Sequence, residues 1–191
     1  MVNGGMLKQA MYSLNESMKK VGREVNVDEI AEIVQGHAVA TAVSAAASGV
    51  IPGAGGAIAL GIACASTITM YGRLASAMGV RLNNGLIKAV ASAVVADLAA
   101  SVAATVAAAA AISFIPAVGN MASAALVGIT NYGFVYLAGL IFIKMVAKLG
   151  VTRIESMTEH EMKEAAKGIQ SEIDIKSAMK EAKASYKANK K

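Results

Sequence analysis

Residues 98–143, LAASVAATVAAAAAISFIPAVGNMASAALVGITNYGFVYLAGLIFI, contain no Asp, Glu, Lys or Arg, and they decide the fold. A second charge-free stretch, residues 33–72, precedes them. Each stretch is interrupted near its middle by a proline, Pro52 in the first and Pro116 in the second, and the chain has no other prolines. Proline lacks a backbone donor and disfavours helix in the residue before it. Each stretch therefore predicts a hairpin of two apolar helices.

The composition favours a membrane-embedded, all-α protein. Hydrophobic residues make up 55% of the chain and charged residues 16%, against roughly 25% charged residues in an average soluble protein. The predicted domains are amphipathic N-terminal helices over residues 1–37, a four-arm apolar hairpin domain over 38–148, and a basic amphipathic C-terminal helix over 149–191. The hairpins themselves cover about 38–72 and 89–143. A soluble bundle tightly packed through small residues is the alternative.

The two hairpins form an internal repeat with an offset of 64 residues, T-x3-A-A-A-x3-I-P-x2-G. We expect pseudo-symmetric packing of the two units, with small residues at four-residue spacing letting the helix backbones approach. Proline suits the first turn of a following helix, and glycine permits a tight turn. The predicted hairpin turns contain Pro52, Gly53, Gly55, Pro116 and Gly119.

Basic residues border the apolar arms. Because such residues stay on the cytoplasmic side of a membrane, the central linker and both termini are predicted to be cytoplasmic. The uncharged turns then lie within the bilayer or beyond it. The first arm is short for a spanning helix, so the second hairpin is expected to span and the first to be re-entrant or shielded. The predicted membrane-surface residues are Arg73, Arg81, Lys88, Lys144 and Lys148.

Few residues carry recognisable chemistry. Asp97 is the only acid between Glu32 and Glu155, and it is either an intramembrane polar site or a wetted residue near the end of its arm. His37 and His160 lie in no metal-binding motif, so no metal, cofactor or catalytic residue is predicted. We expect a protein that is not an enzyme.

The polar ends predict amphipathic helices. A second N-terminal helix is expected to start at Asn26, and Thr158 begins a capping-box pattern with Glu161. The C-terminal helix is basic but diluted by acids and has no aromatic platform, so it suits an anionic membrane surface or its own domain better than nucleic acid. The N-terminal apolar stripe consists of Leu7, Met11, Leu14, Met18 and Val21.

The stretch from Phe114 to Asn120, followed by a small-residue helix with Tyr132 and Tyr136, resembles a known family. It is similar to the uncharacterised bacterial membrane domain of the YcjF type, which is often fused to Era-like GTPases. The resemblance covers residues 38–148, and the GTPase part is absent. It implies a standalone module of the bacterial inner (cytoplasmic) membrane, no catalytic residues to carry over, and by analogy a GTPase partner acting in trans.

Three functions are compatible with these features. The first is a membrane scaffold or membrane-remodelling module whose polar helices recruit partners from the cytoplasm. The second is a colicin-like pore-forming protein with a soluble resting state. The third is an oligomeric ion-conducting or transport protein that uses Asp97. The predicted partners are the lipid bilayer, another protein such as the GTPase, and further copies of the chain.

Overall fold

A computed structural model describes residues 5–48, 55–110 and 120–188. All regular structure in these ranges is helical, which confirms the all-α prediction, and two apolar helix pairs, α2/α3 and α4/α5, form its centre. The helices are α1 (Met6–Lys20), α2 (Val27–Ser48), α3 (Gly55–Ala77), α4 (Asn84–Ala110), α5 (Asn120–Leu149), α6 (Val151–Ser156), α7 (Glu159–Ser171) and α8 (Ile175–Ala188).

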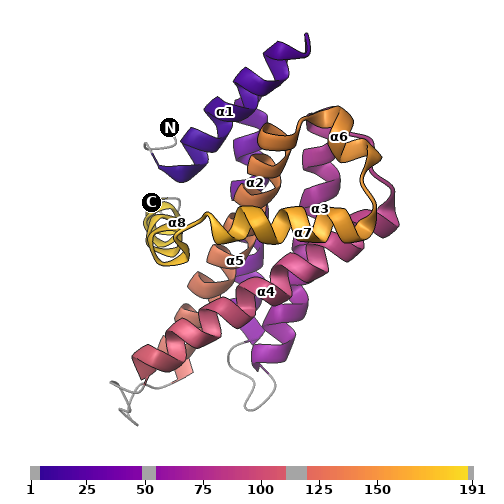
Figure 1. The fold of residues 1–191 in the computed structure, drawn as a ribbon. Coiled ribbons are helices and arrows are strands. Elements are labelled where there is room, and N and C mark those ends of the chain that lie inside the picture. The colour runs from indigo at the N-terminus through magenta and orange to yellow at the C-terminus, as the bar shows by residue number, and fades with distance from the viewer. Residues whose placement is uncertain (1–4, 49–54, 111–119, 189–191) are drawn as a thin grey trace.

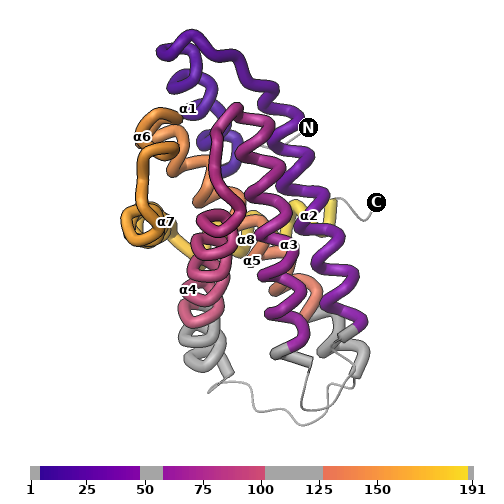
Figure 2. Tube along the Cα trace, turned by 90° about the vertical axis from the view of Figure 1, so that its right-hand side faces the viewer, coloured from indigo at the N-terminus to yellow at the C-terminus, as the bar shows by residue number. Residues whose placement is uncertain are grey.

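Helices α2 and α3 run side by side, and α4 crosses the bundle obliquely (Figure 1). In both views α1 and α6 lie at the upper end, while α7 and α8 lie at mid-height and run across the hairpins (Figure 2). Helix α5 is central because it contacts α1, α2, α3, α4, α7 and α8. It packs most extensively against α2, not against its own hairpin partner α4.

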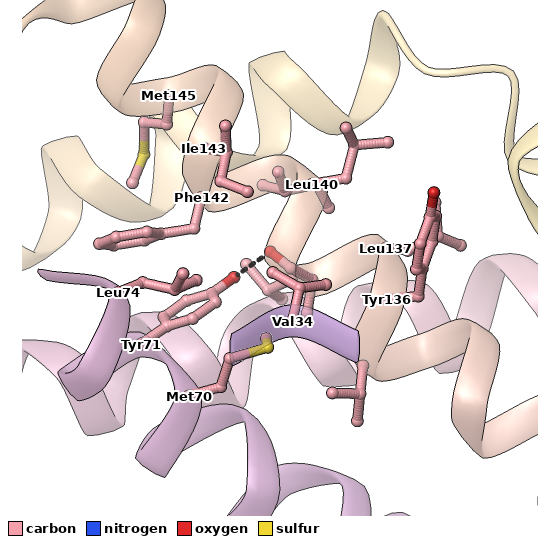
Figure 3. Close-up of a cluster of buried hydrophobic side chains, with 14 of the residues drawn as sticks. Val34, Met70, Tyr71, Leu74, Tyr136, Leu137, Leu140, Phe142, Ile143 and Met145 are labelled. Atoms are coloured by element: carbon pink, nitrogen blue, oxygen red, sulfur yellow. Dashed lines mark hydrogen bonds between the residues drawn. The ribbon is translucent and has the colours of Figure 1, made fainter. Parts of the chain in front are cut away.

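The middle of α5 is mostly apolar on every side, so it requires neighbours all around it. Its residues 131–143 are all buried. Tyr71 of α3 reaches this core, where its hydroxyl donates to the Ala138 carbonyl oxygen at 3.0 Å and its ring lies 4.6 Å from that of Phe142. Figure 3 shows this hydrogen bond among the surrounding side chains. The tyrosine thus ties α3 to the central helix through both a polar and an aromatic contact.

Glycines of α5 allow α2 to approach closely. A Cβ atom on Gly139 would lie 2.8 Å from Val34, and one on Gly128 would lie 2.9 Å from the Ala42 carbonyl oxygen. The expectation that small residues bring backbones together therefore holds for this pair of helices. It does not hold for the small-residue face of α3. Gly61 has no neighbouring atom within 4 Å of an added Cβ, and Ala65 is exposed.

Two N-terminal expectations need correction. The helix that starts after Asn26, whose side chain accepts from the Glu29 N–H at 3.2 Å, does not stop before the first arm. It continues through Gly36 as α2, because a single glycine does not break a helix whose other residues pack. Four residues of the N-terminal stripe are buried as expected, but Val21 is 57% exposed because α1 ends at Lys20.

The C-terminal segment is three helices, whereas a single one was expected. The predicted capping box is present: the Thr158 hydroxyl accepts from the Glu161 N–H, and the Glu161 carboxylate accepts from the Thr158 N–H. The chain then breaks before α8, where the Asp174 carboxylate accepts from the Ser177 N–H at 3.1 Å. An aspartate that bonds the backbone in this way starts a new helix instead of continuing the old one.

Replacing Tyr71 with Phe keeps the ring contact and removes the hydroxyl bonded to Ala138. We expect the free energy of unfolding to fall by about 1 kcal/mol, the net value of a typical intramolecular hydrogen bond. Denaturant unfolding of the protein in detergent micelles measures this loss. The control is Tyr12→Phe, at a side chain that is 70% exposed, which should leave stability unchanged. Equal losses in both variants would contradict the buried hydrogen bond.

Candidate membrane interface

The free ends of the two hairpins lie at one end of the molecule. The C-terminal ends of α2 and α4 and the N-terminal ends of α3 and α5 point downward together (Figure 1), and Figure 2 shows the same for α2 and α3. Of the predicted turn residues, Gly55 begins α3, whereas Pro52, Gly53, Pro116 and Gly119 lie outside the described residues. The apolar hairpins thus present their ends away from the polar helices.

Four helices are long and apolar enough to cross a membrane by length and composition. Their burial differs sharply: 78% of the most apolar window of α5 is buried inside the protein, against 33–44% for the other three helices. Helices α2, α3 and α4 therefore supply most of the outward-facing apolar surface, while α5 lies behind them. The candidate spans are Val27–Ala47, Ile58–Ala77, Asn84–Ser101 and Val127–Leu149.

The five predicted membrane-surface residues lie toward the opposite end of the long helices, away from the hairpin ends. Arg73 and Lys88 are exposed, and Lys144 is half-buried. Arg81 forms an ion pair with Glu155 at 3.5 Å, and Lys148 forms one with Glu172. The structure thus brings together residues that are 75 positions apart in the sequence, and two of the five are held by acids of the C-terminal segment.

Asp97 lies on the outside of α4, where the end of α7 crosses it. It lines an open pocket of about 480 Å³ together with Ser101, Lys167 and Gln170. Its side chain is exposed, and the Gln170 amide donates to the Ser101 hydroxyl at 3.4 Å. Polar side chains thus line the place where α4 and α7 cross, and this is consistent with Asp97 being a hydrated residue.

A short polar seam crosses the first helix pair. His37 Nδ1 of α2 lies 3.3 Å from the Ser66 hydroxyl of α3, and the Thr41 hydroxyl donates to the His37 carbonyl oxygen at 2.8 Å. A separate contact joins α3 to α4, where the Cys64 sulfur lies 3.4 Å from the Ser92 hydroxyl. These contacts are structural, because none of them joins a nucleophile to a base that a third group orients.

Glu181 of α8, which in the sequence is only a charge that dilutes the lysines, joins three helices. Its carboxylate accepts the Tyr136 hydroxyl at 2.6 Å and the Met6 N–H at 2.8 Å. A third contact reaches the Leu7 N–H at 3.4 Å. Helix α1 has no side-chain cap of its own and no acidic residue in its first turn. Glu181 therefore serves as the cap for α1, and its negative charge stabilises the positive end of that helix's dipole.

The backbone of α1 accommodates this contact through Gly5. An added Cβ atom there would lie 2.2 Å from the Glu181 carboxyl carbon. A second contact between α8 and α5 lies alongside, where the Tyr132 hydroxyl is 3.0 Å from that of Ser185. We call the contacts of Glu181 with Met6, Leu7 and Tyr136 the terminal latch, because they join both ends of the chain to the central helix.

Among the described residues, no group of three or more His, Cys, Asp or Glu side chains could hold a metal ion. Comparisons with protein-family models, with curated proteins and with solved structures found no match. The resemblance to the YcjF-type domain therefore stays a prediction.

Replacing Glu181 with Ala leaves the Tyr136 hydroxyl and the first N–H groups of α1 without their charged acceptor. We expect a loss of about 1.5–3 kcal/mol in the free energy of unfolding, the usual value for hydrogen bonds to a charged group. Hydrogen exchange should also accelerate at the amides of the first turn of α1. Glu164→Ala, at an exposed site on α7, is the control. Unchanged exchange in α1 would argue against the latch.

The capping box makes the stability of α7 depend on pH. Hydrogen bonds from the Thr158 N–H and hydroxyl, and then from Arg153, lower the pKa of Glu161 from 4.5 to about 2. Because the folded-state pKa is the lower one, the contribution is complete above pH 4.5 and is lost as the pH falls to about 2. Glu161→Gln should therefore lower the Tm at neutral pH, and the difference from wild type should close toward pH 2.

Thermal unfolding followed by circular dichroism across this pH range measures the difference. Glu164→Gln lies on the same helix outside the capping box and should track the wild type at every pH. A gap between Glu161→Gln and wild type that stays constant from neutral pH to pH 2 would contradict the assignment.

Proposed function

We propose that this protein is a non-enzymatic membrane scaffold or membrane-remodelling module. The charge-free ends of its two hairpins insert into the bilayer from the cytoplasmic side, and α1, α6, α7 and α8 remain outside to recruit partners. The observation that carries this proposal is the separation of apolar and polar segments in space. Both apolar hairpins end together at one pole, and the polar helices lie at mid-height or at the other pole (Figures 1 and 2).

The lengths of the charge-free helix ends support entry from one side. Glu32 is the last charged residue of α2, 16 positions before its end at Ser48, which corresponds to about 24 Å of helix. On α4, 13 positions separate Asp97 from Ala110, or about 20 Å. A hydrocarbon core is about 30 Å thick. These described ends of α2 and α4 are shorter than that, so they suit a wedge that enters one leaflet.

A wedge of this kind explains why the module needs no reacting groups. Four helices that enter from one side add volume to that side, and the added volume favours curvature or marks a membrane site for assembly. The exposed surfaces of α2 and α3 fit lipid contact, since Val43 is 63% and Ile58 is 40% exposed near the hairpin ends. The basic residues at the other pole favour the cytoplasmic face of a bacterial inner membrane.

A colicin-like pore-forming protein is the second candidate, and one observation favours it. Amphipathic helices α1 and α8 cover the most apolar candidate span, α5, whose window is 78% buried inside the protein. A soluble resting state would hide its spanning helix in this way until a bilayer displaced the cover. Release of a dye trapped in vesicles on addition of protein would favour this candidate, whereas vesicles that stay tight would favour the scaffold.

A charge placed on the inserting surface tests the proposal. Gly61 is exposed on α3 with open space around it, so Gly61→Arg should leave the folded bundle intact. Within lipid an arginine costs about 2.5–3.5 kcal/mol at the helix centre, so the fraction of protein that resists carbonate extraction from membranes should fall sharply. The matched control is Ser76→Arg, which adds the same charge at an exposed site near the other end of α3.

Both variants should keep the wild-type circular dichroism and thermal unfolding in detergent. Equal membrane retention of Gly61→Arg and Ser76→Arg would sink the proposed insertion surface. So would full release of the wild-type protein by carbonate.

A further inference from the structure

Helix α8 presents a continuous basic face to its surroundings. Lys176, Lys180, Lys183 and Lys187 are all exposed, and their spacing of four, three and four residues keeps them within an arc of about 60° on an α-helix. The opposite side of α8 is buried, with Ala178 and Ala182 inside the core. The four lysines can therefore be engaged while α8 stays packed on the bundle.

These four lysines are available for an external partner. In the part of the chain that the structure describes, none of them forms an ion pair, whereas Lys148 and Lys163 are paired with Glu172 and Glu159. Glu181, the only acid within α8, is turned toward Tyr136 and α1. The face consequently carries positive charge without an internal partner.

The position of α8 indicates what the partner is. The helix runs across the hairpins at mid-height, between the polar pole and the hairpin ends (Figures 1 and 2). Asp97, the last charge on α4 before its apolar end, lines the pocket next to Ile175, the first residue of α8. If the hairpin ends enter a bilayer as proposed above, α8 lies at the level of the lipid headgroups. Lysine stems can reach along the surface there and hold their ammonium groups in water.

We infer that this lysine face of α8 binds the phosphates of anionic phospholipids and fixes the depth to which the hairpins insert. The inference rests on the proposed function. Each lysine near an anionic membrane surface contributes about 1 kcal/mol, or roughly fivefold in affinity. Two lysines together contribute roughly thirtyfold. Because the contribution is electrostatic, it weakens as salt is raised.

Vesicle flotation of the full-length protein tests the inference. The probes are vesicles of phosphatidylcholine alone and vesicles of phosphatidylcholine mixed with phosphatidylglycerol, at low and high salt. We expect the wild type to bind both and to prefer the anionic vesicles at low salt. Lys180→Gln combined with Lys183→Gln should lower affinity for the anionic vesicles roughly thirtyfold and leave affinity for the neutral ones unchanged.

The matched control removes the same charge elsewhere. Lys19→Gln combined with Lys20→Gln changes two exposed lysines at the C-terminal end of α1, remote from the hairpin ends (Figure 1), and should keep the wild-type preference. Equal losses in both double variants would overturn the inference in favour of a net-charge effect. A full preference retained by the α8 variant would overturn it and point to an acidic protein as the partner of this face.

The outcomes also separate this inference from the proposed function. Wild-type protein that binds neutral and anionic vesicles equally would overturn the lysine face as a lipid site and leave hairpin insertion standing. Wild-type protein that floats with neither kind of vesicle would overturn both.

Discussion

The rest of the structure depends on the enclosure of α5. Its residues 131–143 are buried on every side, so the other helices must surround it, and they do so by several means. Helix α2 approaches closely at Gly128 and Gly139, α3 contributes Tyr71, and α1 and α8 contribute amphipathic faces. Hydrophobic burial drives this enclosure, whereas glycine positions and a few hydrogen bonds decide which helix occupies which side.

This enclosure relates the two candidate functions to each other. Helices α2, α3 and α4 show apolar surface outward, as a protein bathed in lipid would, while α1 and α8 cover part of α5 with polar outer faces, as a protein in water would. The same molecule is thus suited to water at one pole and to lipid at the other. A scaffold uses this arrangement as it stands, and a pore-forming protein uses it as a starting point that a membrane rearranges.

Much of the fold could be predicted from local features of the sequence. The absence of charge and the two prolines predict the hairpins. The helix caps at Asn26 and Thr158 each bond a backbone N–H three residues later, so both are recognisable from local sequence. The break before α8 was missed because Asp174 lies in a segment whose apolar spacing suits one continuous helix. The hydrogen bond from the nearby backbone to the Asp174 side chain starts a new helix there, despite the continuous apolar spacing.

The candidate site was less predictable, since its parts meet only in three dimensions. The last candidate span has the highest mean hydropathy, 1.6 against 1.2–1.3 for the other three, but hydropathy alone does not say which helices surround it or on which side each lies. The lysine spacing in α8 is visible in the sequence, but its height relative to the hairpin ends is not. Glu181 looks like any other acid of a charged helix until its partners at Met6 and Tyr136 are in place.

The terminal latch also has a consequence for biosynthesis. Met6 and Glu181 are 175 residues apart, so α1 cannot receive its cap until α8 has emerged from the ribosome. Both apolar hairpins are synthesised in that interval, while α8, which covers part of α5, does not yet exist. A nascent chain therefore exposes its hairpins to a nearby membrane before α8 can compete for them. The order of synthesis itself favours lipid over self-burial.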